Sequence, residues 1–230
     1  MSDVMLPRRD SDGNYYISYS QFTSWKDLKS FNLGVRGNLE YMLSYFFGED
    51  FGDAGWAQFG SEVEDYICQR LHADKFTDKE RETMEKIVPL GNFQIETKLW
   101  LLPNVYVKGF IDDATQDMMK IRDYKTASNS SRQRYYKDDY VQLDSYALWV
   151  QQETGKIPDE LEVCIIERKG NCFGMKNARE RLSVGTEIWY HPRITNQERL
   201  DKVRADILTA VFQISDAYKT FLKIHKLTEQ

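Results

Sequence analysis

Three kinds of feature are scarce or missing in this chain of 230 residues, and each shortage excludes a class of protein. Its three cysteines, Cys68, Cys164 and Cys172, form no CxxC pair, which argues against a disulfide framework and a zinc knuckle. No run of about 18 apolar residues is present, so no membrane-spanning helix is expected. The N-terminal sequence also lacks the apolar segment of a signal peptide, so we expect a cytosolic protein that does not act at a membrane.

Positive charge is not in excess either, and this limits how the chain could bind a nucleic acid. Lys and Arg number 31 against 36 Asp and Glu, which gives a formal net charge of −5. A protein that binds polyanions over its whole surface has the opposite balance, so any nucleic-acid site must be a local basic patch. With 41% hydrophobic residues, the chain is long enough for one sizeable domain with a buried core.

The first quarter of the sequence predicts a helical lobe. Ser18 and Gln21 form a possible capping pair for a short helix. In the next segment, apolar residues recur at helical spacing; they are Leu39, Met42, Leu43, Phe46 and Phe47. A glycine-rich stretch, 48–55, then separates this lobe from the rest. The expected organisation is an N-terminal helical lobe over 1–55, a main domain over 56–192 and a C-terminal helix over 193–230 that packs on it.

Two further helices are predicted next, and the first has a carboxylate beside its apolar face. That face consists of Phe59, Val63, Ile67 and Leu71. Glu64 borders the face and lies four residues after Gly60. The second helix begins at a capping box, Thr77 to Glu80, and is expected to reach about Val88.

The middle and end of the chain alternate between strand and helix patterns. Three segments rich in β-branched and aromatic residues predict an antiparallel meander at 92–102, 105–113 and 118–126. A helix is predicted next at 140–155, with Asp138 and Asp139 as possible caps. Two strands follow, one at 160–168 that is expected to be buried on both faces and one at 182–190. The last predicted element is an amphipathic helix that begins at the Thr195–Glu198 capping box. The buried stripe of this last helix is expected to be Leu200, Val203, Ile207, Val211, Ile214, Tyr218 and Phe221. The order of elements indicates the α/β class, with a mixed sheet flanked by helices.

The sequence GFIDDATQDMMKIRDYKTAS, residues 109–128, places charges inside the predicted meander. Side chains alternate along a strand, so Asp123 and Lys125 project from one face, and the intervening turn brings Asp112 close to them. Two carboxylates a few ångströms apart repel unless a positive charge lies between them, and Lys125 or a divalent cation can supply it. Mg²⁺ prefers carboxylate oxygens and keeps several waters, one of which can become a nucleophile.

Simpler interpretations of the same residues stay open at this stage. An Asp-x-Lys sequence is more often a solvated strand face with a surface ion pair. Glu64 could be an ordinary helix acid beside Asp65. Asp113 and Asp117 are expected to be turn residues without a role in the site.

The charged residues nevertheless belong to an ordered series of four motifs. The motifs are Gly60 with Glu64 on a helix, Gly109 to Asp112 and Asp123 to Lys125 on two strands, and Gln142 with Tyr146 on the next helix. Over about residues 57–168, this order resembles the PD-(D/E)XK nuclease superfamily, and within it the RecB-type branch that includes viral alkaline exonucleases. The resemblance implies a restriction-endonuclease-like mixed sheet flanked by helices, here with an N-terminal lobe and a long C-terminal helix.

The resemblance also implies roles for individual residues. The implied catalytic residues are Glu64, Asp112, Asp123 and Lys125. The implied ligands of Mg²⁺ or Mn²⁺ are the carboxylates of Glu64, Asp112 and Asp123 and the backbone carbonyl of Tyr124. Gln142 and Tyr146 would support the site or contact DNA, although both would also suit an ordinary amphipathic helix. Some members of this branch hold an iron–sulfur cluster on four cysteines, which three unspaced cysteines cannot do, so no such cluster is expected.

A basic segment follows Lys125 closely and mixes charges suited to phosphates with rings suited to bases. It contains Arg132, Arg134 and Lys137 together with Tyr135 and Tyr136. We expect its three basic residues to contact DNA, because the segment leaves the proposed site directly. A second basic segment, 168–181, is expected to be a solvated loop.

Together these features predict a divalent-metal-dependent DNA nuclease, with an exonuclease that acts on DNA ends in recombination, repair or viral DNA processing as the first hypothesis. Its location would be the cytosol of a bacterial or virus-infected cell. A structure-specific endonuclease or resolvase of the same superfamily is one alternative. A non-catalytic DNA-binding or assembly protein that kept the nuclease fold is another. The sequence leaves open whether the chain forms a homo-oligomer or works with a recombination or replication partner protein.

Overall fold

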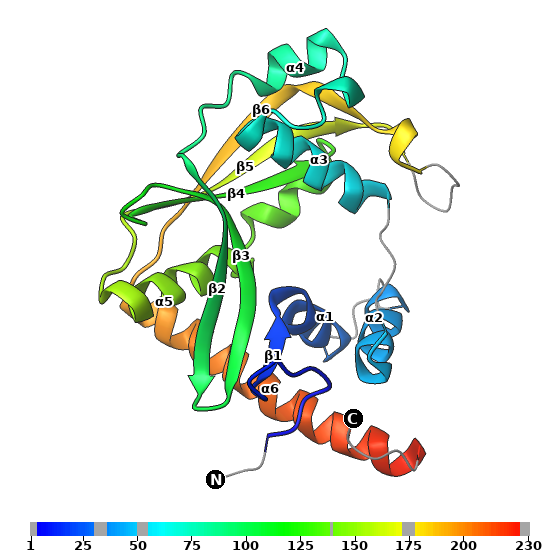
Figure 1. Ribbon diagram of the computed structural model, residues 1–230, viewed down its shortest axis with the longest axis vertical. Helices are drawn as coiled ribbons and strands as arrows, with labels where there is room; N and C mark the ends of the chain where they lie inside the picture. Colours follow the sequence, from blue (N-terminus) through cyan, green and yellow to red (C-terminus); the bar gives the residue numbers. More distant parts are fainter. Residues whose placement is uncertain (1–3, 30–35, 50–54, 139, 172–177, 226–230) are drawn as a thin grey trace.

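The computed structural model describes residues 4–29, 36–49, 55–138, 140–171 and 178–225. Within these residues, helices cover a mixed six-stranded sheet (Figure 1). The strands are β1 Tyr15–Ser18, β2 Asn92–Leu102, β3 Val105–Ala114, β4 Lys120–Ala127, β5 Glu160–Lys169 and β6 Ser183–Arg193. The α-helices are α1 Tyr19–Lys29, α2 Arg36–Phe47, α3 Gly55–Gln69, α4 Asp78–Met84, α5 Gln142–Thr154 and α6 Gln197–His225. The short 3₁₀ helices are η1 Ala73–Lys75, η2 Ser131–Tyr136 and η3 Ala178–Arg181.

Strand β3 is the centre of the sheet, and its two edges are used differently. Antiparallel β2 pairs with one edge over the whole strand. The other edge is shared, because β1 runs parallel to it only as far as Lys108, whereas β4 pairs with it only at Asp113 and Ala114. Within the described residues, 109–112 therefore have no strand partner on this edge. We call this opening the edge gap.

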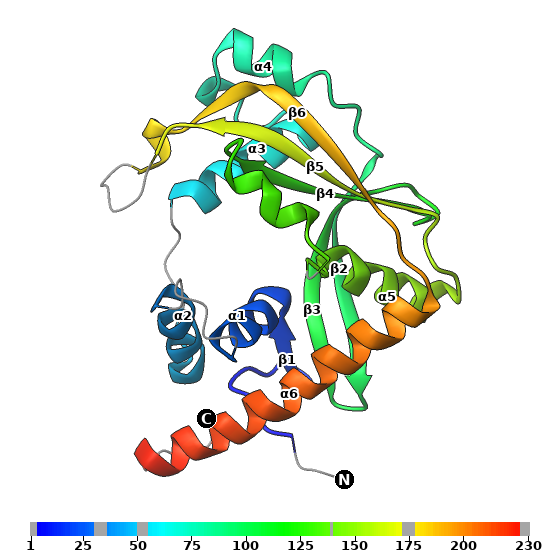
Figure 2. The same cartoon turned by 180° about the vertical axis from the view of Figure 1, so that it is seen from behind.

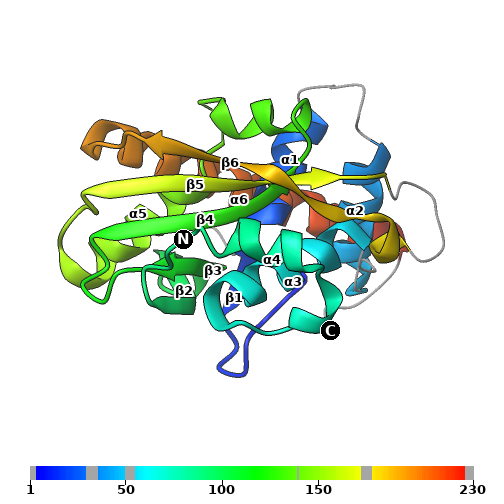
Figure 3. The ribbon, with the colours of Figure 1, turned by 90° about the horizontal axis from the view of Figure 1, so that it is seen from above.

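Two hydrophobic cores lie against the sheet. The larger core joins β1, β2 and β3 and parts of β4 and β5 to α5 and α6, and α6 runs across the lower half of the molecule in Figures 1 and 2. The smaller core joins α3 and the segment after η1 to β4, β5 and β6. Seen from above, α3 and α4 lie on one side of these three strands (Figure 3). Strand β4 therefore contributes to both cores, with Ile121 and Ala127 in the larger and Tyr124 in the smaller.

Most of the predicted elements are confirmed. The meander β2–β3–β4 lies where β-branched and aromatic residues predicted it, and the central residues of β5 are buried as expected. Capping boxes are present at Thr77–Glu80 and at Ser18–Gln21, where Gln21 Oε1 accepts from the Ser18 amide at 2.6 Å. All seven residues of the predicted stripe on α6 are buried. The predicted α/β class with a mixed sheet, flanking helices and a long C-terminal helix is therefore correct.

Two helix caps were predicted wrongly. Asp138 does not cap α5, whose N-cap is Val141 with its amide donating to Tyr19 Oη at 3.0 Å; Asp139 lies outside the described residues. At α6, Asn196 rather than Thr195 accepts from the helix, because the Thr195 hydroxyl donates instead to the buried Asp144 carboxylate at 3.1 Å.

Other departures concern where helices end and which face they bury. Helix α4 ends at Met84 instead of reaching Val88, and the turn that follows carries Ile87 into the core. Leu71 lies beyond the end of α3 and is exposed. On α2, Leu39, Leu43 and Phe47 are exposed by 40–48%, because Met42 and Tyr45 face the core in their place.

The strand β1 was not predicted at all. Its four residues belong to the expected helical lobe, yet they extend the sheet at Tyr15 to Ser18. A strand this short has little pattern of its own, and its pairing with β3 is a long-range contact. None of the described helices is long and apolar enough to cross a bilayer.

Candidate active site

The predicted acids meet at the upper end of the edge gap, where β3 and β4 separate. The two strands are paired at Asp113 and Arg122 but not one residue further along β4. Asp112 is 8% exposed, and its Oδ2 accepts from the Tyr124 amide at 2.8 Å. The Tyr124 amide of β4 therefore donates to the Asp112 side chain instead of to a backbone carbonyl of β3. Because β3 and β4 separate here, the Asp112 carboxylate lies between them and is held by this hydrogen bond.

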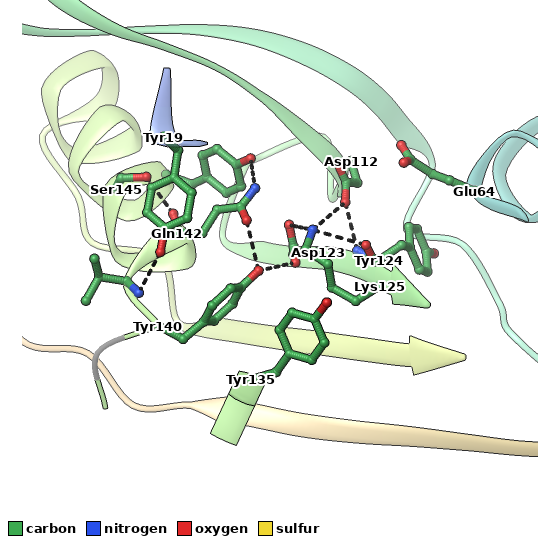
Figure 4. A network of polar contacts seen from close by, with 12 residues as sticks. Tyr19, Glu64, Asp112, Asp123, Tyr124, Lys125, Tyr135, Tyr140, Gln142 and Ser145 are labelled. Carbon is green, nitrogen blue, oxygen red and sulfur yellow. Dashed lines mark hydrogen bonds and ion pairs between the residues drawn. The ribbon is translucent and has the colours of Figure 1, made fainter. Parts of the chain in front are cut away.

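Lys125 lies between the two aspartates (Figure 4). Its Nζ is 2.7 Å from Asp123 Oδ1, 3.9 Å from Asp112 Oδ2 and 3.1 Å from the Tyr124 carbonyl oxygen. Asp123 is completely buried. The convergence predicted from strand alternation is thus confirmed. The ammonium supplies the positive charge that keeps two buried carboxylates together.

The surroundings raise the pKa of both the acid Asp112 and the base Lys125 in this cluster. Burial raises the pKa of Asp112 well above its usual range, with the charges of Asp123 and Glu64 adding to the effect and Lys125 opposing it. Burial alone would lower the pKa of Lys125, but the two aspartates reverse this and raise it above its ordinary value. Lys125 is therefore a stable ammonium in this arrangement.

Glu64 faces the same cluster from α3 and is half-buried. Burial raises its pKa to about 7, while Lys125 and a hydrogen bond from Gln94 pull it down. Gln94 Nε2 donates to Glu64 Oε1, and the Gln94 backbone has a left-handed φ of 50°, which is uncommon for a residue other than glycine. Gln94 lies between two residues of β2 that pair with β3, Phe93 opposite Asp113 and Ile95 opposite Ile111.

Tyr140 connects Asp123 to the predicted Gln142–Tyr146 pair. Its hydroxyl donates to Asp123 Oδ2 at 2.9 Å and lies at the same distance from Gln142 Oε1. Gln142 Nε2 in turn donates to Tyr146 Oη at 2.6 Å. The Tyr146 ring needs a glycine beneath it, because a Cβ at Gly109 would lie 3.2 Å from Tyr146 Cε1. Gln142 and Tyr146 are therefore linked to Asp123 through the Tyr140 hydroxyl.

Asp113 is not a turn residue, contrary to the prediction. It is completely buried, and its carboxylate accepts from the amides of Leu90 and Gly91 at 2.8 and 3.1 Å and from Tyr124 Oη at 2.8 Å. The carboxylate thereby ties the segment before β2 to β4 directly behind the acids. Asp117 does lie in the turn as expected, where it accepts from Thr115 and from the Met119 amide.

The three predicted DNA-contacting residues lie on or just after η2. Arg132 is half-buried, with its guanidinium 4.2 Å from the centre of the Trp189 ring. Arg134 and Lys137 are exposed. Arg134 stacks on Tyr135 at 4.6 Å, and Tyr135 packs edge-on against Tyr140, so Arg134 is two aromatic rings away from Asp123. Of the second basic segment, 172–177 lie outside the described residues, including Cys172 and Lys176.

A groove of about 450 Å³ opens from the cluster along the edge gap. Asp112 and the gap residues Gly109 and Phe110 line it. Its remaining lining comes from the N-terminal lobe, Lys108 and α5: the lobe residues are Arg8, Tyr16, Ser18, Tyr19, Ser20, Gln21 and Tyr41, and those on α5 are Gln142 and Tyr146. The groove therefore gives Asp112 access to solvent between the N-terminal lobe and α5.

The chemistry of the donor set suits a hard divalent cation. The four predicted ligands are all oxygens, and Lys125 Nζ already contacts the Asp123 carboxylate and the Tyr124 carbonyl as a cation would. In the described part of the chain, no three His, Cys, Asp or Glu side chains are gathered closely enough to hold an ion as they stand. An ion at this point would have to share the acids with Lys125 or displace it from between them.

Sequence reasoning missed Tyr140 and Gln94. Tyr140 precedes Gln142 by two residues, a spacing that carries no signal, and it reaches Asp123 only through the placement of α5. Gln94 resembles any polar residue of an exposed strand face. Tertiary packing brings both residues to the acids, and the sequence pattern does not reveal it.

The pKa of Glu64 makes a prediction about stability in metal-free buffer. Because the folded protein holds this pKa at about 7, above the ordinary 4.5, ionisation costs more in the folded than in the unfolded chain. The cost is absent below pH 4.5, grows as the pH rises to about 7 and is full above it. Glu64→Gln should therefore raise Tm above neutral pH and leave it unchanged in acid, as measured by calorimetry in EDTA.

The control for this measurement is Glu82→Gln, which removes an exposed acid of α4. Its Tm should follow that of the wild type at every pH. A Glu64→Gln protein that is less stable than the wild type above neutral pH would show that the carboxylate is stabilised, not strained, by its surroundings.

Comparisons with known proteins give the family of the chain and structures of similar fold. The family model of the PD-(D/E)XK nuclease superfamily matches residues 39–221. No curated protein matches the chain. Among solved structures, a phage-related exonuclease from Haemophilus somnus 129PT is 12% identical with a TM-score of 0.54, and the match covers 92% of this chain and 97% of that one.

Two further solved structures are similar at lower TM-scores. A candidate exonuclease from Eubacterium rectale is 15% identical with a TM-score of 0.46, covering 92% of this chain and 88% of its own. LHK-Exo in complex with dAMP is 7% identical with a TM-score of 0.43, covering 93% of both chains. Because the family model spans most of its length, the chain belongs to the PD-(D/E)XK nuclease superfamily.

Proposed function

We propose that this nuclease is a divalent-metal-dependent deoxyribonuclease of the RecB-like branch, and that it works as an exonuclease on DNA ends in recombination, repair or viral DNA processing. One observation carries the proposal. Lys125 Nζ is held against Asp123, Asp112 and the Tyr124 carbonyl at the point where two strands separate. A binding module has no need for buried acids that repel one another. Such work would place the protein in the cytoplasm of a bacterial or virus-infected cell.

Mg²⁺ or Mn²⁺ is the cofactor that this donor set would bind. The ligands would be the carboxylates of Glu64, Asp112 and Asp123 with the carbonyl oxygen of Tyr124. When bound, the ion would supply Lewis-acid stabilisation of phosphate charge and a water of lowered pKa. Three cysteines are one fewer than a four-thiolate iron–sulfur cluster needs, so the proposal includes no such cluster.

The protein's own groups would position and neutralise the reacting phosphodiester. Lys125 remains protonated beside its two acids, so its part is to stabilise the negative charge that builds on the phosphate oxygens while a water attacks phosphorus. Tyr140 holds Asp123 in one orientation, and Gln142 and Tyr146 hold Tyr140 against α5. The bond from phosphorus to the leaving sugar oxygen breaks as the bond to the water oxygen forms.

The route of the DNA follows from the groove and from η2. A strand lying in the groove would bring a phosphate to Asp112. Arg134 and Lys137 are exposed beyond Tyr135 and would meet the backbone on the η2 side. Arg132 would contribute less, because Trp189 already covers its guanidinium. The Haemophilus somnus protein of the same fold is named a phage-related exonuclease, which makes DNA ends the first substrate to test.

The direct test is DNA digestion by the purified chain. With Mg²⁺ or Mn²⁺ it should degrade end-labelled linear DNA, and EDTA should stop it. Asp112→Asn, Asp123→Asn and Lys125→Ala should each lower the rate by about a thousandfold or more. Asp117→Asn, a turn acid on the same hairpin, should leave the rate unchanged. Digestion that survives all three site substitutions would refute the assignment of the site.

The form of the DNA separates exonuclease from the alternatives. An exonuclease degrades linear DNA and spares a covalently closed circle, whereas an endonuclease or resolvase cuts the circle or a branched junction as well. Binding of DNA without cleavage of any form, together with no calorimetric binding of Mn²⁺, would identify a non-catalytic protein instead.

Tyr140 should act as a positioning residue. Tyr140→Phe removes only the hydroxyl that orients Asp123, so we expect kcat to fall by about ten- to a hundredfold, as for other groups that orient metal ligands. The Mn²⁺ concentration that gives half-maximal activity should rise as well. The control is Tyr136→Phe, whose hydroxyl contacts Arg132 and lies outside the Asp123 network. Unchanged kcat and metal dependence would remove Tyr140 from the mechanism.

A further inference from the structure

The ring of Phe110 is exposed beside the acids, in the floor of the groove. Its side chain is 42% exposed, although it lies on the central strand of the sheet. The edge gap explains this exposure, because β1 ends opposite Lys108 and β4 begins to pair only at Asp113. Phe110 therefore has a strand neighbour on one side only, in the part of the chain that the structure describes.

The neighbours of Phe110 on the same face are polar, so they give the ring no apolar partner. Its cross-strand partner on β2 is Glu96, whose carboxylate pairs with Lys108 Nζ at 3.1 Å. That ammonium also lies 5.6 Å from the centre of the Phe110 ring. An exposed aromatic ring with a lysine beside it, in a groove, is the arrangement that binds single-stranded nucleic acid by stacking and charge.

Spacing along β3 relates this ring to the site. Side chains two residues apart on a strand project from the same side, about 6.5 Å apart, so Phe110 and Asp112 face the groove together. A base stacked on Phe110 would leave its own sugar and phosphate directed toward Asp112. The groove also brings Tyr16 and Arg8 near this face, so a base there is bordered by aromatic and cationic groups.

We propose that Phe110 is a stacking platform for the nucleobase of the nucleotide next to the phosphate that is cut. The proposal rests on the nuclease function proposed above and deepens it, because it assigns the substrate's base, and not only its phosphate, a contact in the site. Stacking is tolerant of sequence, since every base has a π-face. The platform would therefore hold the end of a strand in register with the acids without selecting among bases.

A double-mutant cycle between the protein ring and the DNA base tests this proposal. Wild type, Phe110→Ala and Phe110→Tyr would be compared on duplexes with ordinary ends and on duplexes with one abasic nucleotide at each of the last positions in turn. Affinity is measured by fluorescence anisotropy in EDTA, and KM and kcat are measured with Mg²⁺. Phe47→Ala is the matched control, since Phe47 is similarly exposed at 47% but lies on α2 outside the groove lining.

We expect Phe110→Ala to weaken binding of ordinary ends by about tenfold and to raise KM. An abasic nucleotide at one position should weaken binding by the wild type to the same degree, and Phe110→Ala should add nothing on that substrate. Phe110→Tyr should restore wild-type behaviour because it keeps the ring. Phe47→Ala should change neither constant.

The outcomes separate the platform from the nuclease function. Equal losses for Phe110→Ala on ordinary and abasic ends, or no loss on either, would overturn the platform even if DNA is digested. If Mg²⁺ and Mn²⁺ support no digestion, the proposed function fails, while base-dependent loss of affinity in EDTA would still support the platform. Binding in EDTA that does not depend on Phe110 overturns the platform in that case as well.

Discussion

The contact of Lys125 with two buried carboxylates is the interaction on which the site depends. Asp123 has no exposed surface, and Asp112 has little, so a positive charge between the two carboxylates offsets the cost of burying them side by side. The lysine meets this need within hydrogen-bonding distance of Asp123 and of the Tyr124 carbonyl. One ammonium faces two carboxylates here, and Glu64 approaches them from α3, which is the observation behind the proposed cation site.

The sheet provides the place for this cluster by leaving β3 unpaired over four residues of one edge. Strand β1 pairs with this edge as far as Lys108, and β4 pairs with it again from Asp113. The gap lets a side chain, Asp112, accept from the Tyr124 amide, and it opens the groove toward solvent. Behind it, Asp113 and Tyr140 hold the two strands and Asp123 in place. Adjacent residues of the β3–β4 hairpin thus have different contacts: Asp113 binds backbone amides, whereas Asp112 faces Lys125.

The parts of this arrangement that follow local rules could be predicted from the sequence. Strand alternation and a short turn place Asp112, Asp123 and Lys125 together, and helical spacing places Glu64 at the border of an apolar face. The edge gap could not be predicted, because it depends on where a four-residue strand stops and where two strands separate. Asp113 was misassigned because acids are common in turns, and here the carboxylate binds two backbone amides instead. Tyr140 and Gln94 owe their positions to tertiary packing alone.

The central claim, that these acids form a cation site which Lys125 shares, is tested most directly by calorimetric titration of Mn²⁺ into three proteins. Asp123→Asn should lose binding, because it removes a ligand. Lys125→Met should bind Mn²⁺ more tightly than the wild type, by about tenfold or more, because an ammonium within 4 Å of both acids no longer competes for them. Equal binding by all three proteins would contradict the account, since the ion would then lie elsewhere.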